Sequence, residues 1–244
     1  RLVVGAIGDS DTGLSTITDW LEQITDGEPA FTAVGTVFAD GQAIDSLPSS
    51  AQTLSVGGSS GAGLIDLSDN DTSGTPALVL RGSDGGAFRL GLDELGATLR
   101  VDGGSVTTEG AGNQIVIGDS GPAIALVEDG ATLSTVDLRV GDRARGEMML
   151  AGSDTTATVS SINGQTSWDG SGYLGVGDDS YGRLTVSDSA VLEVVTLDND
   201  PNGAGANVGD RTNGRGELIV DNATVNFRDS DGVIANYGPY LEVG

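Results

Sequence analysis

A glycine that follows Val or Ile recurs along the second half of this 244-residue chain, and it constrains the fold more than any other feature. The recurring glycines are Gly118, Gly141, Gly177, Gly209 and Gly244, and an aspartate follows each of the first four. A second anchor alternates with them without a break, a small residue and an alanine that open a short apolar run: Ala97, Ala131, Ala157, Ala190 and Ala223. Two anchors in strict alternation indicate an internal repeat of about 30 residues, as in solenoid folds.

Within each unit apolar and polar residues alternate, which is the period of a β-strand. Leu184 and Val186 alternate before a Ser-Asp-Ser corner, and Leu192 and Val194 alternate after it. A third short run, such as residues 173–176, precedes each Gly-Asp pair. We therefore predict an all-β fold, a parallel and right-handed β-helix of about six to eight coils with three short strands per coil. A β-sandwich of regularly spaced strands is the alternative, and the constant order of the anchors favours the solenoid.

The repeat is clearest over residues 88–244 and weakens toward the N-terminus, where residues 54–57 predict a degenerate coil. Residues 1–50 are expected to cap or decorate the solenoid, with one short amphipathic helix at 19–24. No domain boundary is evident, so we predict a single solenoid domain over residues 1–244. The chain starts on Arg1 rather than Met and stops at the beginning of another repeat, so we expect it to be a segment of a larger protein.

The charge of the chain limits the classes of partner that it can bind. It has 36 acidic residues against 11 basic ones, all of them arginine, for a net charge of -25. Such an excess repels a nucleic-acid backbone and an anionic membrane surface. The absence of Cys and His excludes disulfides, thiolate or imidazole metal sites, and histidine-based triads. No apolar run is long enough to span a bilayer. We expect no nucleic-acid partner and no membrane insertion of this segment.

The aspartates that follow the recurring glycines are the first candidate site. If the coils stack, Asp119, Asp142, Asp178 and Asp210 form a column with a spacing of about 4.8 Å. Like charges this close repel one another, so solvent, Arg143 and Arg211 next to two of them, or a bound cation must relieve the repulsion. The simplest interpretation is that each aspartate hydrogen-bonds its own turn.

Aspartates two residues apart are the second candidate site, because calcium prefers several carboxylate oxygens on flexible loops. The pairs that we single out as calcium ligands are Asp69 with Asp71, Asp198 with Asp200, and Asp229 with Asp231. No EF-hand loop or RTX nonapeptide is present, and chance pairing among many acids is the alternative interpretation. We assign no catalytic and no cofactor-binding residue, and calcium is the one cofactor that the sequence suggests.

Two stretches, YLGVGDDSYGRLTVSDSAVLEV (173–194) and NVGDRTNGRGELIVDNATVNF (207–227), resemble the repeat of autotransporter-type passenger domains and related bacterial surface proteins. In that repeat a strand ends in Val-Gly, and a polar loop and Gly-x-Leu-x-Val follow. The resemblance covers roughly residues 88–244. It implies export across a Gram-negative envelope, an extracellular or outer-membrane-associated location, and a role in adhesion, aggregation or biofilm matrix. The terminal β-barrel and the signal peptide of that family do not occur in this sequence.

These features together predict a structural or adhesive segment rather than an enzyme. The segment would be an elongated acidic rod that self-associates end to end or laterally, or binds a cell-surface glycan, and so builds filaments or extracellular matrix. A polysaccharide-degrading β-helix enzyme, a lyase or hydrolase, is the alternative. It requires carboxylates, arginines and aromatic rings on one face of several coils, and the local aromatic residues are Trp168, Tyr173 and Tyr181. A trimeric phage-fibre-like segment is the third candidate.

Overall fold

The computed structural model of the chain describes residues 2–7, 53–56, 62–68, 77–81, 87–91, 96–109, 113–161, 172–196, 204–229 and 240–244. Every regular element in these ranges is a β-strand, and the strands form three sheets. No helix among the described residues is long and apolar enough to cross a membrane. The helix predicted at residues 19–24 lies outside the described ranges.

Within each of the three sheets, the strands lie side by side in the order in which they follow one another along the chain. Sheet A contains β1 (Leu2–Ile7), β3 (Ala62–Ser68), β6 (Ala97–Asp102), β9 (Ala123–Glu128), β12 (Gly146–Ala151), β15 (Tyr181–Ser187) and β18 (Arg215–Asp221). Sheet B contains β4 (Ala77–Arg81), β7 (Ser105–Glu109), β10 (Thr132–Thr135), β13 (Thr156–Ser160), β16 (Val191–Thr196) and β19 (Thr224–Asp229). Sheet C contains β2 (Thr53–Val56), β5 (Ala87–Leu90), β8 (Gln114–Ile117), β11 (Asp137–Val140), β14 (Tyr173–Val176), β17 (Gly205–Val208) and β20 (Tyr240–Val243).

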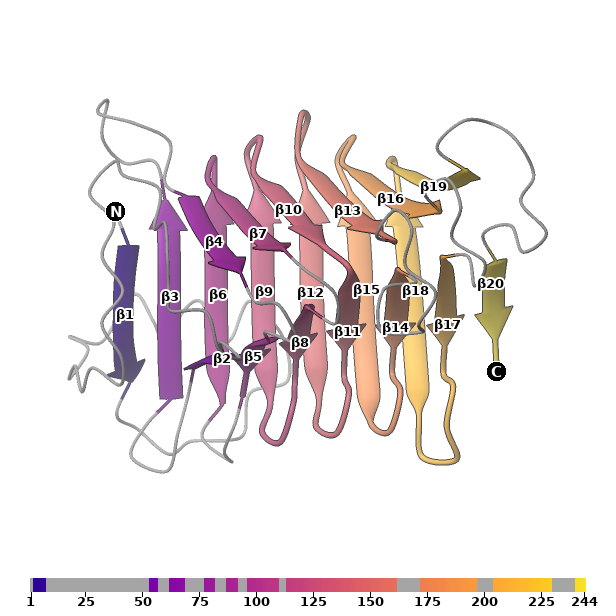
Figure 1. Cartoon of the computed structure of the whole chain (residues 1–244), viewed down its shortest axis with the longest axis horizontal. Helices are drawn as coiled ribbons and strands as arrows, with labels where there is room; N and C mark the ends of the chain where they lie inside the picture. Colours follow the sequence, from indigo (N-terminus) through magenta and orange to yellow (C-terminus); the bar gives the residue numbers. More distant parts are fainter. Residues whose placement is uncertain are drawn as a thin grey trace.

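The chain runs from a strand of sheet C to one of sheet A and then to one of sheet B, and returns to sheet C one coil further along (Figure 1). Strands β2 to β19 thus make six coils, numbered 1 to 6 from the N-terminal end, and β20 opens a further one. Consecutive coils pair in parallel, whereas β1 pairs antiparallel with β3. The prediction of a parallel β-helix with three strands per coil is confirmed.

The core forms because each strand turns alternate side chains inward, where they stack on the equivalent residues of the coils on either side. In sheet A one inward ladder consists of Ile65, Leu99, Ala125, Met148 and Leu184, all of them buried. Sheet C supplies a similar buried ladder from Phe88 to Ala206. The degenerate coil expected at residues 54–57 is confirmed, because β2 stacks in register on β5.

A column of glycines forms the corner between sheets C and A. Their φ angles lie between +75° and +82°, a region that L-residues with a side chain avoid: Gly91, Gly118, Gly141, Gly177 and Gly209. The amide of Gly177 donates to the carbonyl of Val140 in the preceding coil at 2.7 Å. A Cβ on Gly141 would lie 2.3 Å from the carbonyl oxygen of Tyr181. The recurring glycine therefore allows both the turn and the close approach of the next coil.

The alanine anchors do not form one column, so that part of the predicted repeat is wrong. Three of them precede strands of sheet B at equivalent positions: Ala131, Ala190 and Ala223. Ala97 instead opens β6 in sheet A, and Ala157 is paired with Leu133 inside sheet B. Strands of both sheets begin with small residues before a β-branched one, and a motif this short does not distinguish them.

The corner between sheets B and C absorbs the variation in coil length. Only Val136 separates β10 from β11, whereas residues 161–172 lie between β13 and β14. At the far end, β18, β19 and β20 are the last strands of their sheets. Their apolar residues are consequently less covered than those of the inner coils, with Val220 48% and Val243 70% exposed.

Candidate functional site

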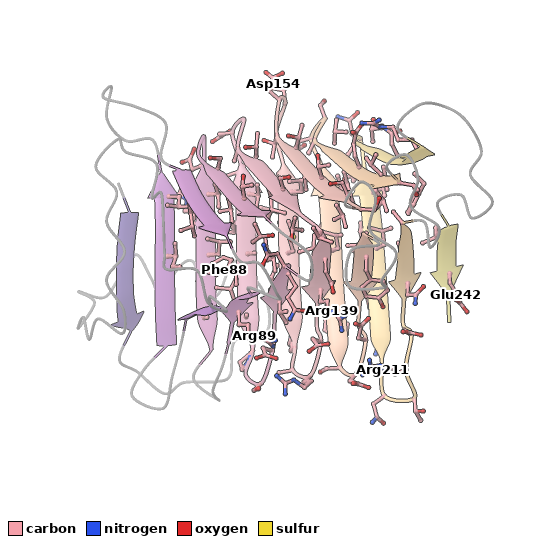
Figure 2. All side chains as sticks on the ribbon, viewed as in Figure 1. Phe88, Arg89, Arg139, Asp154, Arg211 and Glu242 are labelled. Carbon is pink, nitrogen blue, oxygen red and sulfur yellow. The ribbon has the colours of Figure 1, made fainter. Side chains whose placement is uncertain are left out.

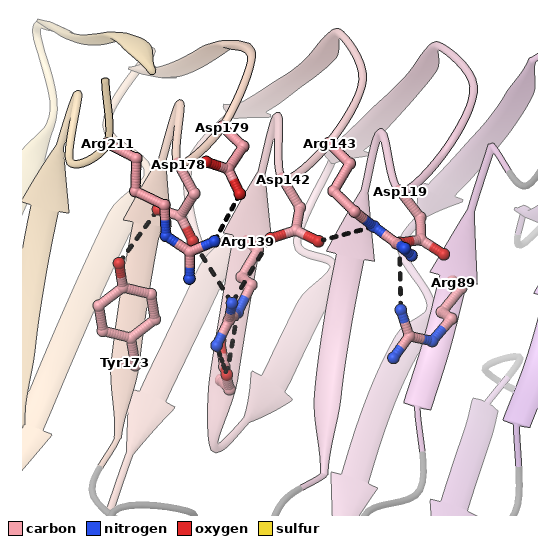
Figure 3. Close-up of polar contacts among 10 residues, drawn as sticks. Arg89, Asp119, Arg139, Asp142, Arg143, Tyr173, Asp178, Asp179 and Arg211 are labelled. Carbon is pink, nitrogen blue, oxygen red and sulfur yellow. Dashed lines mark hydrogen bonds and ion pairs between the residues drawn. The ribbon is translucent and has the colours of Figure 1, made fainter. Parts of the chain in front are cut away.

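Most of the charged side chains that contact one another gather at the corner between sheets C and A, in coils 2 to 6 (Figures 2 and 3). We name this region the arginine corner and define it by 15 residues: Arg89, Arg139, Arg143, Arg145, Arg183, Arg211, Arg215, Asp119, Asp137, Asp142, Asp178, Asp179, Asp210, Glu147 and Glu217. Seven of the 11 basic residues thus lie among eight acidic ones, for a local formal charge of -1 out of the total of -25. The rest of the chain carries almost all of the negative charge.

Asp119 joins three coils. Its side chain is only 2% exposed, and it follows the corner glycine of coil 3. Arg89, which points outward from β5 in coil 2, forms an ion pair with it at 3.1 Å. Arg143, at the corner of coil 4, donates to the same carboxylate oxygen through Nε at 3.1 Å and also through Nη2. The buried carboxylate is therefore compensated from both neighbouring coils, as a buried charge requires.

Arg139 is the centre of a second cluster. It points outward from β11 and donates to both carboxylate oxygens of Asp137, through Nε at 3.1 Å and Nη2 at 3.0 Å. Its Nη1 lies 3.4 Å from a carboxylate oxygen of Asp142 and 3.5 Å from one of Asp178 in the next coil. One guanidinium thus compensates three carboxylates. Burial nevertheless raises the pKa of Asp137 to about 6, and the arginine opposes that shift.

Asp178 has a further partner in Tyr173, whose hydroxyl donates to it at 3.0 Å (Figure 3). The guanidinium of Arg139 lies 5.2 Å from the centre of the Tyr173 ring, within the range of a cation–π contact. Burial is the main cause that raises the pKa of Asp178 above its usual value. Burial and the negative charge of Asp178 raise the pKa of Tyr173. This tyrosine is therefore a neutral hydrogen-bond donor at physiological pH.

The structure corrects the simplest interpretation of the aspartate column. Asp119, Asp142 and Asp178 are buried and paired with arginines, and Asp210 in the last coil is exposed. Of the two arginines expected to relieve the column, Arg143 does so, mainly in the preceding coil. The other expected arginine pairs instead with Asp179, next to the column (Figure 3).

Arg89 and Arg139 were not among the sequence candidates. Both occupy the third position of a sheet C strand, and only the side-chain period shows that they point outward. The sequence signal that could have identified them is an arginine two residues before the corner glycine, as in Arg89-Leu90-Gly91 and Arg139-Val140-Gly141.

The arginine corner continues onto the outer face of sheet A around Tyr181. The guanidinium carbons of Arg145, Arg183 and Arg215, one from each of coils 4 to 6, lie 5.4, 5.5 and 5.7 Å from the centre of its ring. Glu147, Arg183 and Glu217 alternate in sign along the neighbouring column. Arg183 lies 3.7 Å from the first glutamate and 3.1 Å from the second. Consecutive coils therefore carry opposite charges at matching positions, which favours this stacking order over a slipped one.

The aspartates predicted to bind calcium are not placed by the structure. Asp69, Asp71, Asp198, Asp200 and Asp231 lie outside the described residues, as does Trp168. Asp229 ends β19 with only its backbone described. Across the described ranges no cluster of three or more acidic side chains has an arrangement that could hold a metal ion. Calcium binding at the three pairs stays a prediction.

Chemically, the arginine corner offers two properties. The first is cohesion between coils, because breaking a buried ion pair costs about 3–5 kcal/mol whereas an exposed pair contributes about 1 kcal/mol or less. The second is a carboxyl group, Asp137, that exchanges protons near pH 6 beside an arginine.

No family model matches the chain. Searches of curated proteins and of solved structures likewise find no significant similarity. The fold itself, a parallel β-helix, defines the structural class of this protein.

Proposed function

We propose that this chain is a structural or adhesive segment of a secreted or cell-surface bacterial repeat protein. In this proposal the solenoid is a stiff, acidic rod that self-associates, or binds a cell-surface glycan, in adhesion, biofilm or extracellular matrix. The sequence resemblance to passenger-domain repeats supports the bacterial, extracellular setting, and the lack of Cys is compatible with it.

The observation that carries the proposal is the succession of ion pairs across the coils. Arg89 with Asp119 joins coil 2 to coil 3, and Asp119 with Arg143 joins coil 3 to coil 4. Arg139 with Asp178, and then Arg183 with Glu217, continue the series to coil 6. Since each coil of a solenoid contacts only its neighbours, its stability is a sum over these interfaces. A cross-link at each interface from coil 2 to coil 6 suits a rod that resists bending and local unwinding.

The last coil supports self-association through its end. Within the described ranges no strand pairs with the outer side of β18, β19 or β20, and such an edge is a template on which a further strand can pair. Val220, Leu241 and Val243 are exposed there by 48%, 49% and 70%. In the proposal a coil of a second copy covers these residues, and the rod grows end to end.

Sedimentation velocity over a range of protein concentrations tests this growth, with electron microscopy to show whether filaments lengthen along the rod. A variant with Leu241→Asp and Val243→Asp should shift assembly to higher concentration. Thr132→Asp, an exposed position of sheet B far from the end, is the control and should not. A monodisperse monomer at every concentration, with and without calcium, would refute the proposal. A stable trimer would favour the fibre-like alternative.

A second candidate function is cleavage of an acidic polysaccharide. It is favoured by Asp137, whose pKa of about 6 suits a general acid, and by Asp178, Arg139 and Tyr173 beside it. The test is to incubate the protein with a panel of uronate-containing polysaccharides and to measure new reducing ends and unsaturated products. Asp137→Asn should abolish cleavage, while Asp154→Asn at the opposite edge of sheet A should not. No product from any substrate would eliminate this candidate.

A further inference from the structure

The two ends of the sheet A strands form two long edges of the sheet, and these edges expose different charged groups. At the arginine corner many carboxylates lie beneath the surface and the guanidinium groups lie above them. The side chains of Arg143, Arg211 and Arg215 are 55%, 54% and 75% exposed. The carboxylates of Asp119 and Glu147 are only 2% and 4% exposed. Asp210 is exposed here too, and Asp179 and Glu217 are 35% and 31% exposed, so this edge presents both signs of charge. Arg211 and Arg215 are nevertheless more exposed than the carboxylates with which they pair, and we call this side of sheet A the guanidinium edge.

The other edge of sheet A, where the chain turns into sheet B, presents carboxylates. Asp129, Asp154 and Asp188 occupy equivalent turns of coils 3, 4 and 5, with φ angles of 54°, 63° and 53°. Aspartate is one of the few residues with a side chain that readily adopts this left-handed conformation. All three are exposed, and none forms an ion pair with another described residue. Arg100 pairs at this aspartate edge with Asp102 and Glu128, at 3.0 and 3.1 Å, and the three turn aspartates lie outside that cluster.

Both edges share one repeat, because their charges come from the same stack of coils. Neighbouring strands of sheet A are about 4.8 Å apart, so the coils that carry these charges follow one another at that spacing along both edges. A guanidinium edge laid along an aspartate edge can therefore match charges at several coils without bending either rod. Arg211 and Asp154 mark the two edges at opposite ends of the sheet A strands in Figure 2.

We propose that copies of this chain associate side by side, with the guanidinium edge of one copy against the aspartate edge of the next. The proposal rests on the self-association proposed above and assigns a surface and a partner to it. The contact joins two different surfaces, so each added copy leaves one edge of either kind free. Such an interface produces an open-ended array of rods when the rotation between copies does not close a ring.

The overall charge of -25 sets the conditions for this contact. Two copies repel at long range, and salt screens that repulsion beyond a Debye length of about 8 Å at 0.15 M ionic strength. Direct arginine–aspartate contacts survive this screening, but they weaken at 1 M, where the Debye length is about 3 Å. Lateral association should therefore be strongest near physiological ionic strength and weaker on either side of it.

Charge reversal with mixing tests the proposal by sedimentation velocity at 0.15 M salt. One double variant, R211E/R215E, makes both edges acidic, and the other, D154R/D188R, makes both edges basic. Each alone should self-associate at least tenfold more weakly than the natural chain. An equimolar mixture of the two should regain association, because acidic edges then meet basic ones. Thr158→Arg is the control: it adds a charge at an outward position of β13 in sheet B, away from both edges and from the last coil, and should leave association unchanged.

Neutral variants test whether a loss of association comes from the removed charges or from local unfolding. R211Q/R215Q and D154N/D188N remove the charges with little strain, since Asn also tolerates the left-handed turn. They should weaken association while circular dichroism stays unchanged. The lateral contact would be overturned if the variants at both edges associated as strongly as the natural chain, or if the equimolar mixture stayed dissociated. If the edge variants leave association unchanged but Leu241→Asp with Val243→Asp abolishes it, the lateral contact is refuted and end-to-end growth is retained. A natural chain that is monomeric at all salt concentrations would refute both.

Discussion

Replacing Arg139 with methionine removes one charge and keeps a side chain of comparable reach. It leaves the carboxylates of Asp137, Asp142 and Asp178 facing one another without the guanidinium that all three contact. These carboxylates are at most 18% exposed, so solvent compensates them poorly. Removing one partner from a buried ion pair costs about 3–5 kcal/mol, and we expect a loss in that range at pH 8.

The loss should shrink in acid. Burial already raises the pKa of Asp137 to about 6 and raises that of Asp178, and loss of the arginine raises both further. A carboxyl group whose pKa is raised on folding stabilises the folded state below its unfolded pKa of about 4, and this contribution disappears as the pH rises through the folded pKa. The variant should therefore lose stability more steeply than the natural chain between pH 4.5 and pH 8.

The assay is urea unfolding followed by circular dichroism at those two pH values. Arg228→Met is the matched control, because it breaks an exposed pair with Glu193 and should cost about 1 kcal/mol or less. A loss below about 1 kcal/mol for Arg139→Met at pH 8, or an equal loss at both pH values, would refute the reasoning about buried carboxylates.

Three further perturbations have definite expected outcomes. Asp137→Asn should flatten the fall in melting temperature between pH 4 and pH 7, because it removes a group whose raised pKa of about 6 costs on the order of 3 kcal/mol at neutral pH. Gly182→Ala should lower the free energy of unfolding in urea by about 1–3 kcal/mol, since its Cβ would lie 1.9 Å from the carbonyl oxygen of Val140. An unchanged midpoint would show that the corner can expand. If Asp198 and Asp200 bind calcium, addition of a chelator should lower the melting temperature of the natural chain. The melting temperature of the D198N/D200N variant should not respond to chelator. An unchanged melting temperature of the natural chain would exclude a stabilising calcium.

The sequence by itself determined the strands and one of the corners. Alternation with period 2 is a local property of any strand that buries one face, so Leu184, Val186, Leu192 and Val194 were correctly assigned to the core. The corner glycine is equally local, because a positive φ excludes most other residues wherever the chain turns this way. A repeat of such local signals suffices for the β-helix class.

The assignment of strands to sheets and the partners of the charges were decided only by the tertiary structure. Asp119 meets Arg143 across 24 residues, and Arg183 meets Glu217 across 34. Those partners depend on how many residues the corner between sheets B and C takes up in each coil, and that number varies with no local signal. An outward-pointing charged side chain also gains little free energy from an ion pair with any one neighbour, because water screens the interaction. Their pattern becomes meaningful only when the buried ladders have set which coil lies beside which, because burial of the apolar side chains dominates the register.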